Sequence, residues 1–309
     1  MSTKSNGNQL FYEYFADWVE VYKQGAVRLI TYQKYLMTLR RVRELAPTLR
    51  IYELDKRSYQ NLINEYARTH EKQTTMDFHH HLKSAILDAV DEGLLSTDPT
   101  RKVIIKGKTP ASKKPKFLSQ HELQSLLANL NLTDEPNWDW FILLVAKTGA
   151  RFSEALALTP HDFDSEEYKI KIAKTWNYKC ADGGFAETKN QSSRRILQID
   201  PLLCKQLARI SGGLPPDKPI FVKGRVFNST VNNRLEALCK AAEVPVISIH
   251  SLRHSHASAL IFAGVSIASI AKRLGHSSVT TTQETYLHII QELENQDSEK
   301  IMRYLAGLA

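Results

Sequence analysis

The sequence predicts a mainly α-helical protein of two domains, with a small antiparallel β-sheet in the second domain. Its 309 residues exceed the roughly 100–200 residues of a typical single domain. Apolar residues recur at helical spacing through residues 1–100 and again from residue 119. Between these regions, Pro99, Pro110 and Pro115 interrupt a polar, basic segment. We therefore expect a first domain at 1–100, a linker at 101–116 and a second domain at 117–309.

Four amphipathic helices are expected in the first domain, because apolar residues recur there every three or four positions. They run over Phe11–Tyr22, Thr31–Leu45, about 55–66 and Thr74–Leu94, and Gly93 fits the end of the last one. The second helix carries a basic surface made by Lys34, Arg40, Arg41 and Arg43.

The second domain begins and ends with helices around a region of different periodicity. Ser119 and Glu122 form a predicted capping box, and helices follow at Trp138–Lys147 and Phe152–Leu158. Tyr168–Ala173 alternates apolar and basic residues, which is typical of a strand. With further strands at Phe185–Lys189 and Arg194–Ile199, it predicts one small antiparallel sheet. Six more helices are expected at 201–210, 227–242, 250–263, 266–274, 279–289 and 291–306.

The net charge of +8 is concentrated in the expected linker. Residues 1–100 contain 13 basic and 13 acidic residues, whereas 101–116 contains seven basic residues and no acidic one. The seven are Arg101, Lys102, Lys106, Lys108, Lys113, Lys114 and Lys116. Such a segment is either a solvated linker or one that lies along a polyanion. In the second case its affinity would fall steeply with salt, because each neutralised phosphate releases a counterion.

Several classes of protein are disfavoured by what the sequence lacks. No stretch approaches the roughly 20 apolar residues that cross a bilayer, and the N-terminus has no secretory signal. The three cysteines, Cys180, Cys204 and Cys239, are far apart, which argues against a disulfide framework or a structural zinc site and favours a reducing, cytoplasmic compartment. There is no phosphate-binding glycine loop and no cluster of carboxylates for a two-metal site, which agrees with a protein that uses neither cofactor nor metal.

Four polar features of the second domain stand out. Arg151 follows Gly149 between two predicted helices, His250 and Arg253 open another helix, His276 follows Gly275 in a turn, and Tyr286 lies in the next helix. Each feature alone is weak evidence for a functional site, since single arginines, histidines and tyrosines are common on helices. Residues 266–286 also fit a helix-turn-helix that reads DNA without cutting it.

In combination these features resemble the tyrosine recombinase, or phage integrase, family. The resemblance lies in Thr148-Gly149-Ala150-Arg151-x-Ser153-Glu154, His250-x-Leu252-Arg253-His254-Ser255-x-Ala257-Ser258, Leu274-Gly275-His276-Ser277-Ser278 and Thr282-x-x-x-Tyr286-Leu287-His288. The family's lysine is matched by Lys189 in Glu187-Thr188-Lys189-Asn190. The motifs cover residues 117–290, whereas the first domain is similar only in size, helix count and position.

The resemblance implies a DNA strand transferase that needs neither metal nor ATP. Tyr286 would attack a phosphodiester and form a 3′-phosphotyrosine, with Arg151 and Arg253 holding the phosphate. His250 would take the phenolic proton, Lys189 would protonate the leaving 5′-oxygen, and His276 would bind a phosphate oxygen. Glu154 would orient an active-site side chain.

The same resemblance implies double-stranded DNA as partner, a helical core-DNA-binding first domain, a homotetramer on two DNA sites when active, and accessory DNA-bending proteins. The expected DNA contacts are Lys34, Arg40, Arg41, Arg43, Lys106, Lys108, Lys113, Lys114 and Lys116. The C-terminal run 292–309 would pack either on a neighbouring subunit or on its own domain. Only residues 1–9 precede the first helix, so either the enzyme works at simple core sites or an arm-binding domain is missing.

Three functions remain open beside integration or excision of mobile DNA. One is chromosome or plasmid dimer resolution by the same chemistry. The second is a type IB topoisomerase, which needs no partner site. The third is a non-catalytic helix-turn-helix DNA-binding protein, which would form no covalent adduct.

Overall fold

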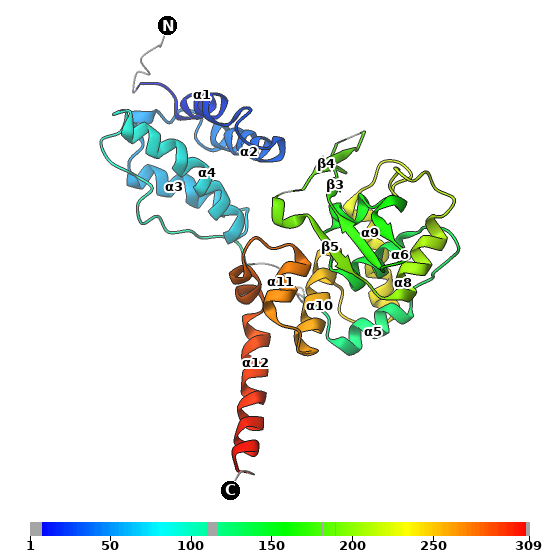
Figure 1. Ribbon diagram of the computed structural model, residues 1–309. Coiled ribbons are helices and arrows are strands. Elements are labelled where there is room, and N and C mark those ends of the chain that lie inside the picture. Colours follow the sequence, from blue (N-terminus) through cyan, green and yellow to red (C-terminus); the bar gives the residue numbers. More distant parts are fainter. Residues whose placement is uncertain (1–7, 110–116, 181, 189, 307–309) are drawn as a thin grey trace. The chain divides into compact units, whose positions relative to one another are not determined.

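The computed structural model describes residues 8–109, 117–180, 182–188 and 190–306 (Figure 1). The side chains of 288, 290–301 and 303 are outside this description. The chain divides into two compact units, Met1–Lys113 and Lys114–Ala309. The division falls within the segment expected to be the linker.

The first unit is built from the four helices that periodicity predicts. They are α1 (Phe11–Lys23), α2 (Leu29–Leu45), α3 (Lys56–Ala67) and α4 (Lys72–Asp91), with a short 3₁₀ turn at Ile51–Glu53 between α2 and α3. Their buried faces form an aromatic-rich core that includes Phe15, Trp18, Tyr59 and Phe78. The Trp18 indole N–H donates to Asp88 across this core at 2.6 Å, which satisfies its polar edge.

The first part of the expected linker packs on this unit. Val103 and Ile105 lie against its core, and Ile104 exchanges two backbone hydrogen bonds of 2.9 Å with the Gln60 side chain. At Gly107 the chain passes so close to α4 that a Cβ added to this residue would lie 2.2 Å from the backbone nitrogen of Lys72. Residues 101–108 therefore extend the helical unit, and residues 110–116 lie outside the described residues.

The second unit surrounds a central buried helix, α6 (Trp138–Thr148). The other helices are α5 (Gln120–Ala128), α7 (Phe152–Leu156), α8 (Pro201–Ser211), α9 (Asn228–Ala241), α10 (Ile249–Phe262), α11 (Ile267–Leu274) and α12 (Val279–Ala306). The Ser119–Glu122 capping box is confirmed at the start of α5. The helices α6 and α10 pack directly together, so the helix that carries His250 and Arg253 lies against the helix that precedes Arg151.

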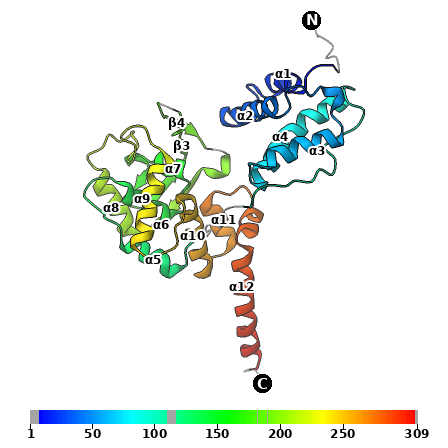
Figure 2. The same cartoon turned by 180° about the vertical axis from the view of Figure 1, so that it is seen from behind.

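Two small antiparallel sheets replace the single sheet that was expected. One has the order β1 (Phe163–Asp164), β2 (Lys169–Ile172), β5 (Arg195–Gln198), with Ile170 opposite Leu197. The other pairs β3 (Lys174–Trp176) with β4 (Phe185–Glu187) as a separate hairpin (Figure 2). The expected single sheet missed β1 and β3, because strands of two or three residues are too short to show a period of two.

The C-terminal region differs from expectation in where its helix breaks. The sequence predicted two helices that meet near residue 290. In the structure α12 continues from Val279 to Ala306, and its non-helical backbone lies at Tyr286 (φ −112°, ψ 16°). This sparsely populated region of backbone conformation often holds active-site residues.

None of the helices in the described residues has both the length and the apolar character needed to span a membrane.

Candidate active site

The end of α6 delivers the first arginine of the site. Gly149 adopts a left-handed conformation (φ 66°) and terminates the helix, as glycine does at many helix ends. A Cβ there would lie 2.7 Å from the His256 ring and 2.9 Å from Leu274. Both the conformation and the close packing require glycine. Arg151 follows two residues later as the N-cap residue of α7.

A buried carboxylate holds Arg151 in place. Glu154, 1% exposed, accepts from the Arg151 guanidinium at 2.7 Å and from the Arg151 backbone N–H at 2.9 Å. It also accepts from Arg195 at 2.9 Å. Burial works to raise the pKa of Glu154, but the charges and hydrogen bonds of Arg195 and Arg151 outweigh it and lower that pKa. Glu154 is therefore an ionised anchor for two guanidinium groups.

The second predicted arginine is almost fully buried. Arg253 is 3% exposed and donates to the carbonyls of Gly149 at 2.6 Å and Leu274 at 2.7 Å. These contacts tie α10 to the ends of α6 and α11. Burial, together with the positive charge of Arg151, lowers the pKa of Arg253 to about 9. The guanidinium still carries its charge at neutral pH.

The site has an excess of positive charge. Arg151, Arg195 and Arg253, hereafter the arginine cluster, interact electrostatically with one another and with a single carboxylate, Glu154, among the residues that the structure describes. Backbone carbonyls satisfy guanidinium N–H groups but do not neutralise their charge. Such a cluster favours an anion, and its planar donors suit a phosphate.

Tyr286 lies beside this cluster. Its side chain is 2% exposed, and burial raises the pKa of its phenol to about 12, although the charge of Arg253 acts in the opposite direction. The Tyr286 hydroxyl is 2.9 Å from Nδ1 of His254. The His254 ring in turn meets the His250 ring at a centroid distance of 4.9 Å and a right angle.

The two predicted histidines are kept neutral by their surroundings. Partial desolvation, with the charges of Arg253 and Arg151, lowers the pKa of His250, although that residue keeps an exposed surface. Burial and the same two arginines lower the pKa of His276 to about 4. His276 follows Gly275, whose carbonyl accepts from Arg151 at 3.0 Å, and its Nδ1 lies 2.7 Å from the Thr282 hydroxyl. The turn after α11 is thereby attached to the cluster.

The structure thus assembles most of the predicted site from four separate segments. Arg151 and Glu154, His250 and Arg253, His276, and Tyr286 converge around the arginine cluster. Lys189 lies outside the described residues, as do Lys113, Lys114 and Lys116.

The predicted basic residues of the first unit do not form a single surface. Lys34, Arg40, Arg41 and Arg43 are all exposed on α2. At about 100° per residue, Lys34 and Arg41 share one side of the helix, whereas Arg43 lies on the opposite side. Arg41 pairs with Glu44 at 2.6 Å, and Arg43 lies over the Tyr12 ring. Lys106 and Lys108 are exposed on the segment packed against the same unit.

Sequence reasoning gave no role to two residues of the site. Arg195 is 5% exposed at its side chain and also donates to the carbonyls of Arg273 at 2.6 Å and Ser193 at 2.8 Å. A signal was present, because Arg195 shares a strand face with the buried Leu197. His254 is a member of the motif that begins at His250, but the resemblance implied no role for it. It lies one helical turn after His250 and contacts Tyr286.

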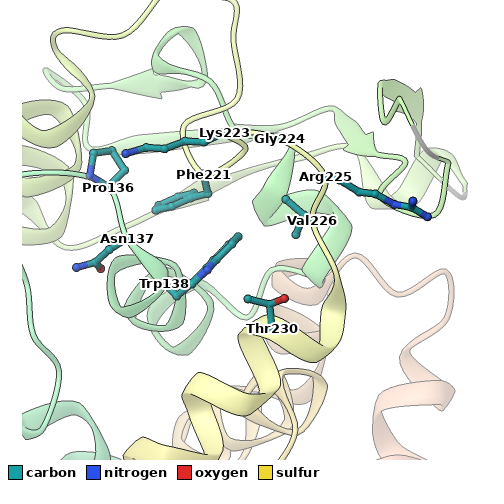
Figure 3. A pocket seen from close by; sticks show the side chains of 9 residues that line it. All are labelled: Pro136, Asn137, Trp138, Phe221, Lys223, Gly224, Arg225, Val226 and Thr230. Carbon is teal, nitrogen blue, oxygen red and sulfur yellow. The ribbon is translucent and has the colours of Figure 1, made fainter.

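A pocket of about 470 Å³ lies elsewhere, at the N-terminal end of α6 (Figure 3). Trp138, Phe221 and Val226 provide its apolar lining, and Lys223 and Arg225 contribute charge. Since α6 has 11 residues, its two ends are about 16 Å apart. None of the converging site residues lines this pocket.

Comparisons with known proteins agree with this geometry. A model described as the phage integrase family matches residues 116–292. The chain is 23% identical to the integrase of Staphylococcus phage L54a over 94% of this chain and 92% of that protein. It is 29% identical to the ICEBs1 integrase of Bacillus subtilis (strain 168) over 71% of this chain and 62% of that protein. It is 28% identical to the tyrosine recombinase XerD of Mycobacterium leprae (strain TN) over 66% of both.

Solved structures show the same fold. The Tn1549 transposon integrase in complex with transposon right end DNA superposes with a TM-score of 0.78 at 18% identity, over 95% of this chain and all of that one. A lambda integrase dimer bound to a core site superposes with a TM-score of 0.65 at 16% identity, over 88% of this chain and 76% of that one.

Proposed function

Because this chain belongs to the phage integrase family and is a tyrosine-type site-specific recombinase, we propose that it cleaves and rejoins DNA through a covalent 3′-phosphotyrosine intermediate formed by Tyr286. The observation that supports this most strongly is the position of a buried phenol beside the arginine cluster. A phosphodiester bound there would have its phosphorus within reach of the nucleophile and its oxygens facing guanidinium groups.

The arginine cluster supplies the electrostatic part of the mechanism. In the transition state, negative charge builds on the nonbridging oxygens of the phosphate. Arg151 and Arg253 are already fixed by Glu154 and by backbone carbonyls, so little reorganisation is needed when that charge develops. We assign a third contact to His276, which would donate a hydrogen bond to a phosphate oxygen.

Proton transfers complete the reaction. The phenolic proton of Tyr286 leaves as its oxygen bonds to phosphorus, and the P–O5′ bond breaks. Lys189 is proposed to protonate the departing 5′-oxygen. We also propose that His250 takes part in catalysis. Its ring contacts His254, which in turn contacts the Tyr286 hydroxyl that loses the proton. Rejoining is the reverse, with a 5′-hydroxyl of the partner strand as the attacking group.

The biological role that we propose is integration or excision of mobile DNA. The names of a phage integrase and the ICEBs1 integrase among the similar proteins support this over dimer resolution. The proposed partners are double-stranded DNA and three further copies of the chain on two DNA sites, with accessory DNA-bending proteins. We place the protein in the reducing cytoplasm, with which the free state of Cys180, Cys204 and Cys239 is compatible.

A pool of duplexes with a randomised central sequence provides the test. Wild-type protein should form covalent adducts that survive denaturation, and sequencing the attached strand would give the preferred site. Peptide mapping should locate the DNA on Tyr286. Tyr286→Phe removes one oxygen, so it should form no adduct while binding the selected duplex with unchanged affinity. An adduct formed by Tyr286→Phe, or one located elsewhere in wild type, would contradict the proposal.

A further inference from the structure

The contact between His254 and Tyr286 carries an inference that rests on the proposed function. We propose that His254, and not His250, takes the proton from Tyr286 as the nucleophile attacks. A general base must lie within about 2.6–3.2 Å of the atom that it deprotonates. Nδ1 of His254 is 2.9 Å from the Tyr286 hydroxyl. Within the described part of the chain, His254 is the hydrogen-bond partner of that hydroxyl.

The phenol needs such help. Burial raises the pKa of Tyr286 to about 12, so at neutral pH the free phenolate is scarce and an unassisted attack would be slow. The charge of Arg253 favours the phenolate but does not offset the burial. A base in contact with the hydroxyl removes the proton during the attack, so the phenolate need not form beforehand.

His250 is less suited to the same task. Its ring contacts the His254 ring edge to face and not the phenol. Partial desolvation and the charges of Arg253 and Arg151 lower the pKa of His250, which makes it a weaker base. Its exposed surface leaves it free to approach the DNA, and its right-angle contact fixes the orientation of the His254 ring. We therefore assign His250 to phosphate binding and to the orientation of His254.

The proton balance is as follows. In the proposed step, His254 begins as the tautomer with its proton on Nε2, so that Nδ1 accepts from the Tyr286 hydroxyl. During attack the Tyr286 O–H bond breaks, an N–H bond forms at Nδ1, and the phenolic oxygen bonds to phosphorus. The P–O5′ bond breaks and the 5′-oxygen is protonated by Lys189. In rejoining, the imidazolium of His254 returns its proton to the departing phenol.

Three titratable groups face His254. They are His250 on its own helix, Tyr286 on α12, and His276 in the turn after α11, whose pKa His254 lowers when charged. Because the charge of each of these groups affects its neighbours, the acidity of the nucleophile itself gives a sharper readout than a pH profile. A ring-fluorinated tyrosine at position 286 has a more acidic phenol and depends less on a base.

The experiment compares adduct formation by wild type, His254→Asn and His254→Phe on the duplex selected with wild-type protein. The asparagine oxygen can still accept a hydrogen bond near the position of Nδ1, but it cannot accept a proton. His254→Phe keeps the ring without a nitrogen. His121→Asn is the matched control, since His121 is exposed on α5. Binding of the duplex shows which variants are folded.

His254→Asn should bind normally and form adduct about 10²–10⁴-fold more slowly. Fluorinated tyrosine should restore its rate by at least about tenfold and change the wild-type rate much less. If His254→Asn reacts as fast as wild type, or faster, the hydrogen bond only restrains Tyr286 and the assignment is wrong. Equal effects of fluorination in both proteins would also overturn it. These results leave the wild-type adduct at Tyr286 intact, whereas absence of that adduct would reject the proposed function itself.

Discussion

The charge of Glu154 can be removed with almost no change of shape by Glu154→Gln. Its two carboxylate oxygens accept three donors: the Arg151 guanidinium on one, and the Arg151 backbone N–H and Arg195 on the other. An amide has one oxygen, so in either orientation its NH₂ group faces at least one of these donors. At least one charge-assisted hydrogen bond is lost, which costs about 1.5–3 kcal/mol.

The loss of neutralisation adds to this cost. Both partners lie at a carboxylate that is 1% exposed, and Arg195 is itself buried. Breaking a buried ion pair by removing one partner costs about 3–5 kcal/mol in total. For a domain of 150–250 residues each kcal/mol shifts Tm by about 2–4 °C. Glu154→Gln should therefore lower the Tm of the second unit by roughly 6–20 °C.

Urea denaturation and calorimetry at pH 7 would measure this effect. Glu135→Gln is the matched control, because Glu135 pairs with Lys223 at 3.5 Å on the surface, where a pair contributes about 0–1 kcal/mol. Since the pKa of Glu154 is lowered in the folded state, its contribution is present above about pH 4.3 and is lost as the pH falls further. A Glu154→Gln protein within about 1 kcal/mol of wild type would refute the view that this carboxylate anchors the cluster.

Two other measurements test different parts of the molecule. Replacing Lys113, Lys114 and Lys116 with Gln should reduce the slope of log affinity against log salt by up to about 0.9 per lysine that contacts a phosphate. The matched control replaces Lys205, Lys218 and Lys223 with Gln. A slope equal to that of wild type or of the control would show that Lys113, Lys114 and Lys116 do not contact the DNA. His256 donates from Nδ1 to the Ala146 carbonyl and accepts from Arg273 at Nε2, and burial lowers its pKa to about 3. The stabilisation by neutral His256 is therefore present above about pH 6.5 and is lost as the pH falls towards 3. His256→Gln should make the free energy of unfolding fall less steeply over that range. Equal declines in the variant and in wild type would exclude His256 as the cause.

Helix positions followed from the sequence because each amphipathic helix repeats its own signal several times. The four helices of the first unit and the capping box at Ser119 are local features, readable from a few neighbouring residues. The basic segment was harder to interpret. Its charge suggested a linker that is either solvated or lies along a polyanion. Val103 and Ile105 nevertheless pack on the helical unit, and these apolar residues were the overlooked sign of packing.

Residues that act through tertiary contacts were less accessible. Arg195 follows another arginine in a short strand, which suggests solvent exposure until the face that it shares with Leu197 is considered. Its partners are Glu154, 41 residues before it, and the carbonyl of Arg273, 78 residues after it. No local pattern encodes such pairings. The family resemblance pointed to residues that the structure brings together, but it did not indicate that His254 contacts Tyr286.

The excess of positive charge also explains how one site can be stable before DNA binds and reactive afterwards. Glu154 compensates part of the arginine cluster, and carbonyl groups orient the remaining guanidinium N–H groups without neutralising them. Burial, together with the positive charges of Arg151 and Arg195, lowers the pKa of Arg253 to about 9. A bound phosphate relieves the repulsion among the guanidinium groups, and the transition state, with more negative charge on the same oxygens, relieves it further. In the proposed mechanism the cluster therefore favours the transition state over the bound substrate, which is the condition for catalysis.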